Sequence, residues 1–345
     1  MSRVSNSVSR RSFVAGLGAG SCAGMISGHW PMPAAHPQGV QSSAADFWTG
    51  EYRARKGDVS LYMFRKRVGE PKAGQPPLPV IFLVHGSSIS SRSSFDLTVP
   101  GRGEYSVMNT FARYGFDVWT MDHENYGRSS RTGGNSDIAS GVEDLKAGVE
   151  VVVRETGRQK IHFSGDSSGG LRAGAYAMIR PERVDKLILL AFTYKGEGSP
   201  TLAQRAQQLE YYRTHNRRLR DREMIRSIFT RDKTGTADPA VGDALADQEL
   251  QFGDQVPTGT YLDMTAHLPL VDPKKVLCPV LLMRGEFDGI ATVDDLYDFF
   301  KQLPNGNRQF VILPGTAHAI SSGLNRQLAW HVMRAFLDMP EPVRS

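Results

Sequence analysis

Hydrophobic residues along this chain form short continuous runs, separated by stretches in which apolar residues recur every three or four positions. Buried strands are predicted for the apolar runs at residues 80–84, 116–121, 160–163, 184–191, 278–283 and 309–313. Helices are predicted at residues 108–114, 142–154, 171–179, 293–303 and 324–337. Residues 59–67 alternate between apolar and polar side chains, as an exposed strand does. Because strands and helices alternate, the pattern predicts a doubly wound α/β fold with a mostly parallel sheet.

The alternation stops at residues 193–273, where polar helical segments such as 201–212 replace strands. We interpret this block as a helical cap over the carboxyl edge of the strands, where ligands enter such sheets. The sheet would then comprise residues 46–192 and 274–345. The second part of the cap is rich in arginine, at Arg213, Arg217, Arg218, Arg220, Arg222, Arg226 and Arg231. Such a run favours a solvated helix face, and the alternative is that it steers an anionic substrate.

The segment Gly165-x-Ser167-x-Gly169 lies between the strand predicted at 160–163 and the helix predicted at 171–179. A strand that turns into a helix within so few residues forces the central residue into a strained conformation, with its side chain projecting from the sheet edge. Glycine on both sides avoids a collision, which favours Ser167 as a nucleophile over Asp166. The backbone N–H of Ser168 would then face an oxyanion at the helix N-terminus.

Two further strand ends carry candidate chemistry. The run at 80–84 ends in His85-Gly86, and the glycine lets the backbone pass close to a ligand, so the N–H of Ser87 is the second candidate oxyanion donor. His85 could act as a base, although a histidine at a strand end more often holds a loop through hydrogen bonds.

The last two strands are followed by the remaining candidate residues. The run at 278–283 leads into a loop with two carboxylates, Glu286 and Asp288, and the last strand leads to His318. All of these positions follow the carboxyl end of a parallel strand, so the fold would gather them with Ser167 at one edge. Asp288 is the preferred acid and Glu286 is the alternative.

The order serine, acid, histidine and the motifs around it resemble the α/β-hydrolase superfamily over nearly all of the chain after residue 45. The matching pieces are His85-Gly86, Asp122-x-x-x-Tyr126-Gly127-x-Ser129, the Ser167 turn, Gly285-x-x-Asp288 and His318. The resemblance implies an eight-stranded sheet with an inserted cap and a Ser167–His318–Asp288 triad. Glu124-Asn125 departs from the Arg-Gly that relatives often carry, which affects the expected shape of that loop only.

These residues predict a serine hydrolase that cleaves a carboxylic ester through an acyl-enzyme. The same triad can cleave lactones, thioesters, amides or C–C bonds, and a non-catalytic small-molecule binding protein on this fold is the alternative outside enzymology. Tyr194 and His267 are candidate pocket residues in the cap. We expect no cofactor and no metal site, because the histidines are scattered without ligand spacing.

Residues 1–45 have the features of an export segment. A weakly apolar Gly/Ala-rich run follows Ser9-Arg10-Arg11-Ser12-Phe13, and this resembles bacterial twin-arginine signals. The alternatives are a disordered basic tail and a lipid anchor at Cys22. The prediction is a periplasmic or secreted protein without a stable membrane span. Removal of this segment lowers the formal charge of +5 by three, so the sequence does not indicate a nucleic-acid partner. It does not indicate an oligomeric state either.

Overall fold

A computed structural model describes residues 46–340, so the predicted export signal and linker at 1–45 lie outside the described residues. The strands are β1 (Phe47–Lys56), β2 (Val59–Val68), β3 (Val80–Val84), β4 (Asp117–Met121), β5 (Ile161–Asp166), β6 (Val184–Leu190), β7 (Arg217–Leu219), β8 (Gln255–Pro257), β9 (Val280–Gly285) and β10 (Arg308–Leu313). The α-helices are α1 (Ser91–Phe95), α2 (Val107–Arg113), α3 (Ile138–Thr156), α4 (Ser168–Ile179), α5 (Pro200–Ala206), α6 (Leu209–Thr214), α7 (Arg222–Ser227), α8 (Pro239–Glu249), α9 (Gly259–Ala266), α10 (Val293–Gln302) and α11 (Arg326–Asp338).

Eight of these strands form one sheet in the order β1-β2-β4-β3-β5-β6-β9-β10. β2 pairs antiparallel with β1 and β4, and the remaining neighbours pair in parallel. The strand order reverses direction around β3, as expected for helical connections that cross to both faces of a sheet. This arrangement confirms the predicted doubly wound, mostly parallel α/β sheet.

Two hydrophobic cores cover the two faces of the sheet. On β3, Phe82 points into the core with α3, α4 and α10, whereas Ile81 and Leu83 point into the core with α2 and α11. Successive residues of a strand face opposite sides, so a strand that is covered on both faces is apolar at every position. That is why the central strands appear in the sequence as continuous apolar runs.

The sheet edge at β1 and β2 differs from the sequence prediction. Residues 59–67 were expected to form an exposed strand, but β2 is largely buried, since Leu61 and Phe64 pack into the two cores. Its charged residues are paired: Arg65 Nη2 lies 2.6 Å from Asp117 Oδ2. β1, which the hydrophobic pattern does not predict, pairs with β2 along its whole length and covers its outer edge.

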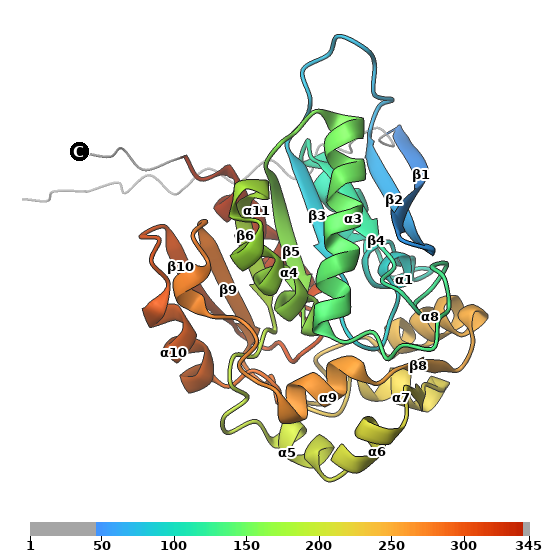
Figure 1. Ribbon diagram of the computed structural model, residues 1–345, viewed down its shortest axis with the longest axis vertical. Coiled ribbons are helices and arrows are strands. Elements are labelled where there is room, and N and C mark those ends of the chain that lie inside the picture. Colours follow the sequence, from blue (N-terminus) through green and yellow to red (C-terminus); the bar gives the residue numbers. More distant parts are fainter. Residues whose placement is uncertain (1–45, 341–345) are drawn as a thin grey trace, which may run out of the picture. The chain divides into compact units, whose positions relative to one another are not determined.

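The block predicted as a helical cap contains α5 to α9 and also a short antiparallel pair of strands, β7 and β8. The predicted helix 201–212 is two helices, α5 and α6, and the arginine-rich segment forms β7 and α7. In Figure 1 these cap elements, coloured yellow-green to orange, lie together beneath the sheet. Among the described residues, no helix combines the length and the apolar character that crossing a membrane requires.

Candidate active site

Ser167 lies in the turn between β5 and α4, in a conformation that is strained for a residue with a side chain. Its φ of 57° and ψ of −122° fall outside the regions that such residues normally adopt. The turn is anchored to the sheet, because the Ser167 N–H donates a hydrogen bond of 2.7 Å to the Leu190 carbonyl on β6. The Ser167 side chain lines a cavity at the carboxyl edge of the strands.

Glycine is required on both sides of Ser167 for different reasons. A Cβ on Gly165 would collide with the backbone of Gly169 at the start of α4, as predicted for a tight turn between a strand and a helix. A Cβ on Gly169 would instead collide with the carbonyl oxygen of Val84, at the end of β3. Gly165 is therefore needed for the turn itself, whereas Gly169 is needed because α4 packs closely against β3.

Three predicted side chains from separate loops meet at this edge. His318 Nε2 lies 3.0 Å from Ser167 Oγ, and His318 Nδ1 lies 2.9 Å from Asp288 Oδ1. An ionised carboxylate only accepts hydrogen bonds, so the hydrogen of the neutral imidazole resides on Nδ1. His318 Nε2 is then an acceptor for the Ser167 hydroxyl.

The Asp288 carboxylate is held in place by its own loop. Its Oδ1 accepts hydrogen bonds from the backbone N–H groups of Ile290 and Ala291, at 2.8 and 3.2 Å. Burial by itself raises the pKa of Asp288, but the charge of His318 and these hydrogen bonds outweigh it and lower the pKa below its ordinary value. Asp288 therefore stays ionised beside the imidazole.

The alternative acid, Glu286, is exposed and faces elsewhere. Its Oε2 accepts a 2.8 Å hydrogen bond from the Gly315 N–H. Arg284, which the sequence did not single out, is buried and donates to the carbonyl of Asp288 at 2.9 Å and to that of Ala291 at 2.7 Å. Arg284 thus supports the loop that carries Asp288.

The two candidate oxyanion donors flank Ser167. Ser168 is the first residue of α4, so its N–H has no intrahelical acceptor. The peptide that carries the Ser87 N–H is oriented by His85, whose Nδ1 donates to the Gly86 carbonyl at 2.8 Å while its Nε2 accepts from the His123 N–H at 3.1 Å. In a trans peptide the N–H and C=O point in opposite directions, so the Ser87 N–H points away from His85.

His85 therefore lies in the loop-holding position that the sequence favoured. Burial, together with the nearby His123 and Arg172, holds the pKa of His85 well below its ordinary value, so the ring stays neutral. The close approach of this loop also explains Gly86, where an added Cβ would lie 3.1 Å from the Asp166 carbonyl oxygen.

The cap contacts the same loop directly. Arg218 Nη2 donates to the Ser87 carbonyl at 3.2 Å and to Ser88 Oγ at 2.7 Å. Arg220 forms a buried ion pair with Glu249, and it also donates to the Ser88 carbonyl at 3.2 Å. These two arginines of the cap are not on a solvated face, which corrects the favoured interpretation of the arginine run. The loop after β3 is therefore fixed by His85 on the core side and by Arg218 and Arg220 on the cap side.

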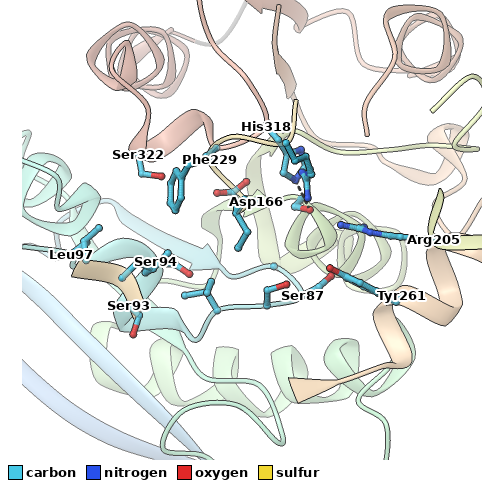
Figure 2. Close-up of a pocket in the computed structure, with 18 residues that line it drawn as sticks. Ser87, Ser93, Ser94, Leu97, Asp166, Arg205, Phe229, Tyr261, His318 and Ser322 are labelled. Atoms are coloured by element: carbon cyan, nitrogen blue, oxygen red, sulfur yellow. Dashed lines mark hydrogen bonds between the residues drawn. The ribbon is translucent and has the colours of Figure 1, made fainter. Parts of the chain in front are cut away.

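The cavity around Ser167 has walls from both the core and the cap. Its lining includes Ser87, Leu97, Asp166, Arg205, Phe229, Tyr261 and His318 (Figure 2). Arg205, Leu97 and Tyr261 were not predicted from the sequence, because nothing in their local sequence indicates the direction of their side chains.

The two pocket candidates chosen from the sequence lie elsewhere. Tyr194 is buried in the core and packs against Phe299, with ring centroids 5.3 Å apart. His267 is exposed at the end of α9 and its Nδ1 lies 2.8 Å from Asp263 Oδ1. Neither residue lines the cavity that contains Ser167.

Asp166, the alternative nucleophile, is at the end of β5 beside Ser167. Burial raises the pKa of Asp166, His318 opposes this rise and Asp288 adds to it, which gives a value of about 6. The imidazole is hydrogen-bonded to Ser167 and not to Asp166. The geometry for base-assisted attack therefore exists at Ser167.

Within residues 46–340, one group of side chains has donor atoms close enough to hold a metal ion, namely Asp232, Asp288 and His318, whose ligand atoms all lie within 4.8 Å of one another. Asp232 belongs to the cap loop after α7, and its Oδ1 lies 3.0 Å from Arg231 Nε. The other two residues already share a hydrogen bond, so a cation would compete with that contact. The sequence did not predict this cluster, because its members lie far apart along the chain.

Comparisons with known proteins identify the family of this chain. Residues 76–323 match the family described as Hydrolase_4, serine aminopeptidase, S33. The chain belongs to this family. The match to this S33 α/β-hydrolase family runs from β3 to the loop after His318. It therefore includes each strand end described above.

Two curated relatives of this S33 α/β-hydrolase are similar over part of their length. A 2-hydroxy-6-oxononadienedioate/2-hydroxy-6-oxononatrienedioate hydrolase from Paraburkholderia phymatum is 35% identical over 100 residues, which is 28% of this chain and 32% of the relative. A hydrolase of the same description from Pseudomonas putida is 30% identical over 145 residues, or 40% of this chain and 43% of the relative. The matched segment spans less than half of either relative.

Solved structures show the same fold at low identity. A bromoperoxidase from Bacillus anthracis superimposes with a TM-score of 0.59 at 19% identity, covering 84% of this chain and 100% of that chain. A 2-hydroxy-6-oxo-6-phenylhexa-2,4-dienoate hydrolase from a Rhodococcus strain gives a TM-score of 0.58 at 19% identity, covering 84% and 99%. At this identity the likeness supports the fold of the S33 α/β-hydrolase and not a particular substrate.

Proposed function

We propose that this protein is a serine hydrolase that cleaves a carboxylic ester through an acyl-enzyme. The observation that carries the proposal is the relay from Asp288 Oδ1 through His318 to Ser167 Oγ, with distances of 2.9 and 3.0 Å, at the wall of a cavity. Serine is a poor nucleophile at its ordinary pKa, and a base in this position removes its proton as it attacks.

The reaction proceeds in two transfers. Ser167 Oγ attacks the ester carbonyl while His318 Nε2 accepts its proton, and the N–H groups of Ser87 and Ser168 stabilise the oxyanion of the tetrahedral intermediate. Collapse breaks the bond to the alcohol oxygen, which receives the proton from His318. Water then attacks the acyl group, His318 takes one proton from the water, and the acid leaves as Ser167 regains its hydrogen.

A second candidate is hydrolysis of a C–C bond next to a ketone. The similarity to two oxo-dienedioate hydrolases favours it, since the names of those relatives describe substrates with a ketone and two carboxylates. The same serine would attack the ketone carbonyl, and the leaving group would be a carbon that must be protonated before it departs.

The deciding experiment compares the protein with Ser167→Ala on p-nitrophenyl acetate, butyrate and octanoate, and on a 2-hydroxy-6-oxo-dienoate whose absorbance is lost on cleavage. Labelling by a fluorophosphonate reports the nucleophile independently of the substrate. We expect ester turnover and labelling that both disappear in the variant. Loss of dienoate absorbance without ester turnover would select the second candidate, and a folded protein that shows neither turnover nor labelling would refute a serine hydrolase.

We also propose that the protein is exported through the segment at residues 1–45. The support is the paired arginine sequence Arg10-Arg11 followed by Phe13 and an apolar run without acidic residues. A fusion of residues 1–45 to a reporter that is active only after export tests this. Equal export from the Arg10→Lys, Arg11→Lys double variant would contradict a twin-arginine route.

A further inference from the structure

The arginines of the cap differ in how their charges are satisfied. Among the described residues, all but one of these arginines have an oxygen acceptor within hydrogen-bonding or ion-pair distance. The arginines with such an acceptor are Arg213, Arg217, Arg218, Arg220, Arg222, Arg226 and Arg231. Their partners are carboxylates, a side-chain amide, a hydroxyl and backbone carbonyls. Most of this arginine-rich segment is therefore explained by contacts that hold the cap together or hold it to the core.

Arg205, on α5, is the exception. Within the part of the chain that the structure describes, its guanidinium has no ion pair and no hydrogen bond, and its neighbour is the ring of Tyr261, whose centroid is 4.0 Å away. Arg205 is partly buried, and the hydration that this burial removes is not replaced by a protein partner, which is costly for a cation. The burial of Arg205 lowers its pKa, although a guanidinium remains charged at neutral pH.

The surroundings of Arg205 are also cationic. The Arg218 guanidinium also stacks on Tyr261, 3.9 Å from the ring centroid, and Arg231 lines the same cavity as Arg205. Burial alone raises the pKa of Tyr261, but the charges of Arg205 and Arg218 outweigh it and lower the pKa to about 7. The lowered pKa of Tyr261 follows from the positive charges of the arginines that surround its ring.

This positive region opens on the cavity that contains Ser167. Arg205 and Tyr261 lie on one side of Ser87 and His318 in Figure 2, whereas Leu97 and Phe229 lie on the opposite side. The cavity thus has one cationic arm and one mainly apolar arm, where Ser93, Ser94 and Ser322 also lie, with the Ser167–His318 pair between them.

We propose that Arg205 receives a carboxylate of the substrate, so that the enzyme acts on anionic esters or ketones whose remaining part is apolar. This proposal rests on the proposed hydrolase function for the reaction, and on the unpartnered guanidinium for the substrate class. A carboxylate matches the planar donor face of an arginine and restores the hydrogen bonds that Arg205 lacks.

The test compares pairs of esters that differ only in charge. Mono-p-nitrophenyl glutarate is paired with its carboxamide analogue, which places the charge on the acyl side, and 4-carboxyphenyl butanoate is paired with 4-carbamoylphenyl butanoate, which places it on the alcohol side. We expect a preference in kcat/KM for the anionic member of at least one pair. Arg205→Gln should reduce that preference about tenfold to a hundredfold, mainly through KM.

Two further variants make the result specific. Arg205→Lys keeps the charge and should retain part of the preference. Arg213→Gln, which removes an exposed cap arginine paired with Glu210 at 3.8 Å, should leave the preference unchanged. A wild-type enzyme without a charge preference in either pair, or a preference that survives Arg205→Gln, would overturn the proposal.

Binding separates this proposal from the proposed function. Glutarate is titrated by calorimetry into the Ser167→Ala protein with and without Arg205→Gln. Arg205-dependent binding would support the anion site even if no ester is cleaved, whereas ester cleavage by Ser167 without any Arg205-dependent binding or preference would leave the hydrolase and remove the anion site.

Discussion

The core wall and the cap wall of the cavity are built in different ways. On the core wall, Ser167, Asp288 and His318 follow the ends of parallel strands, and backbone hydrogen bonds fix their loops. On the cap wall, Arg205 and Tyr261 come from the short helices α5 and α9, and they are placed by stacking between side chains. Reactive groups are thus held by the backbone, whereas the groups that would select the substrate are held by side-chain packing.

The largest expected effect is on the core wall. Asp288→Asn should lower kcat for p-nitrophenyl esters by about 10⁴-fold, because the amide no longer stabilises the imidazolium and allows the wrong tautomer. Glu286→Gln is the matched control in the same loop, and it should stay within about twofold, since Glu286 accepts only from the Gly315 N–H. A large loss in Glu286→Gln with little loss in Asp288→Asn would reverse the assignment of the acid.

The next effect is on folding. Gly169→Ala places a Cβ against the Val84 carbonyl, which is backbone and cannot move aside, so we expect the free energy of unfolding to fall by about 3 kcal/mol or more. Gly133→Ala is the control, because its Cβ would meet open space. Urea denaturation measures both, and equal stability of the two variants would mean that α4 does not approach β3 this closely.

On the cap wall, the apolar arm should respond to acyl length. Phe229→Ala should lower kcat/KM for p-nitrophenyl octanoate about tenfold relative to p-nitrophenyl acetate, because the loss of a buried aromatic side chain removes apolar contact from a long chain only. The ratio of the two kcat/KM values is the measurement. An equal fall for both esters would indicate a general disturbance of the cap.

The smallest expected effect is the pH dependence of anion binding. Tyr261 is faced by Arg205, Arg218, Arg231 and Tyr212, and its pKa is about 7. As the pH rises through this value, the phenolate forms and neutralises the guanidinium groups, so KM for an anionic ester should rise about fivefold between pH 6 and 8.

Tyr261→Phe keeps the stacked ring and should remove this rise. The carboxamide ester corrects for groups such as Asp166, whose titration is common to both proteins. If KM for the anionic ester has the same pH dependence in the variant and in the wild type, Tyr261 does not compete with the substrate for these charges.

The difference between the walls also explains what the sequence could predict. The buried strands and the positions of Ser167, Asp288 and His318 follow from apolar runs and glycine spacing, which depend on the backbone. β1 was missed because Gly50 and four charged side chains interrupt its pattern, and it is a strand mainly because β2 supplies its hydrogen bonds. Tyr194 was misplaced because a residue just beyond β6 can point to the core or to the cap, and only the packing of Phe299 decides which.

The two arginines that contact the loop after β3 give the cap a part in the position of Ser87. Arg218 and the Arg220–Glu249 pair hold the carbonyls of Ser87 and Ser88 from the cap side. The cap is therefore not an interchangeable module, even though it is a single insertion between β6 and β9. A chimera that exchanges residues 193–273 to obtain a new specificity has to retain these donors, or it will lose turnover together with the old substrate.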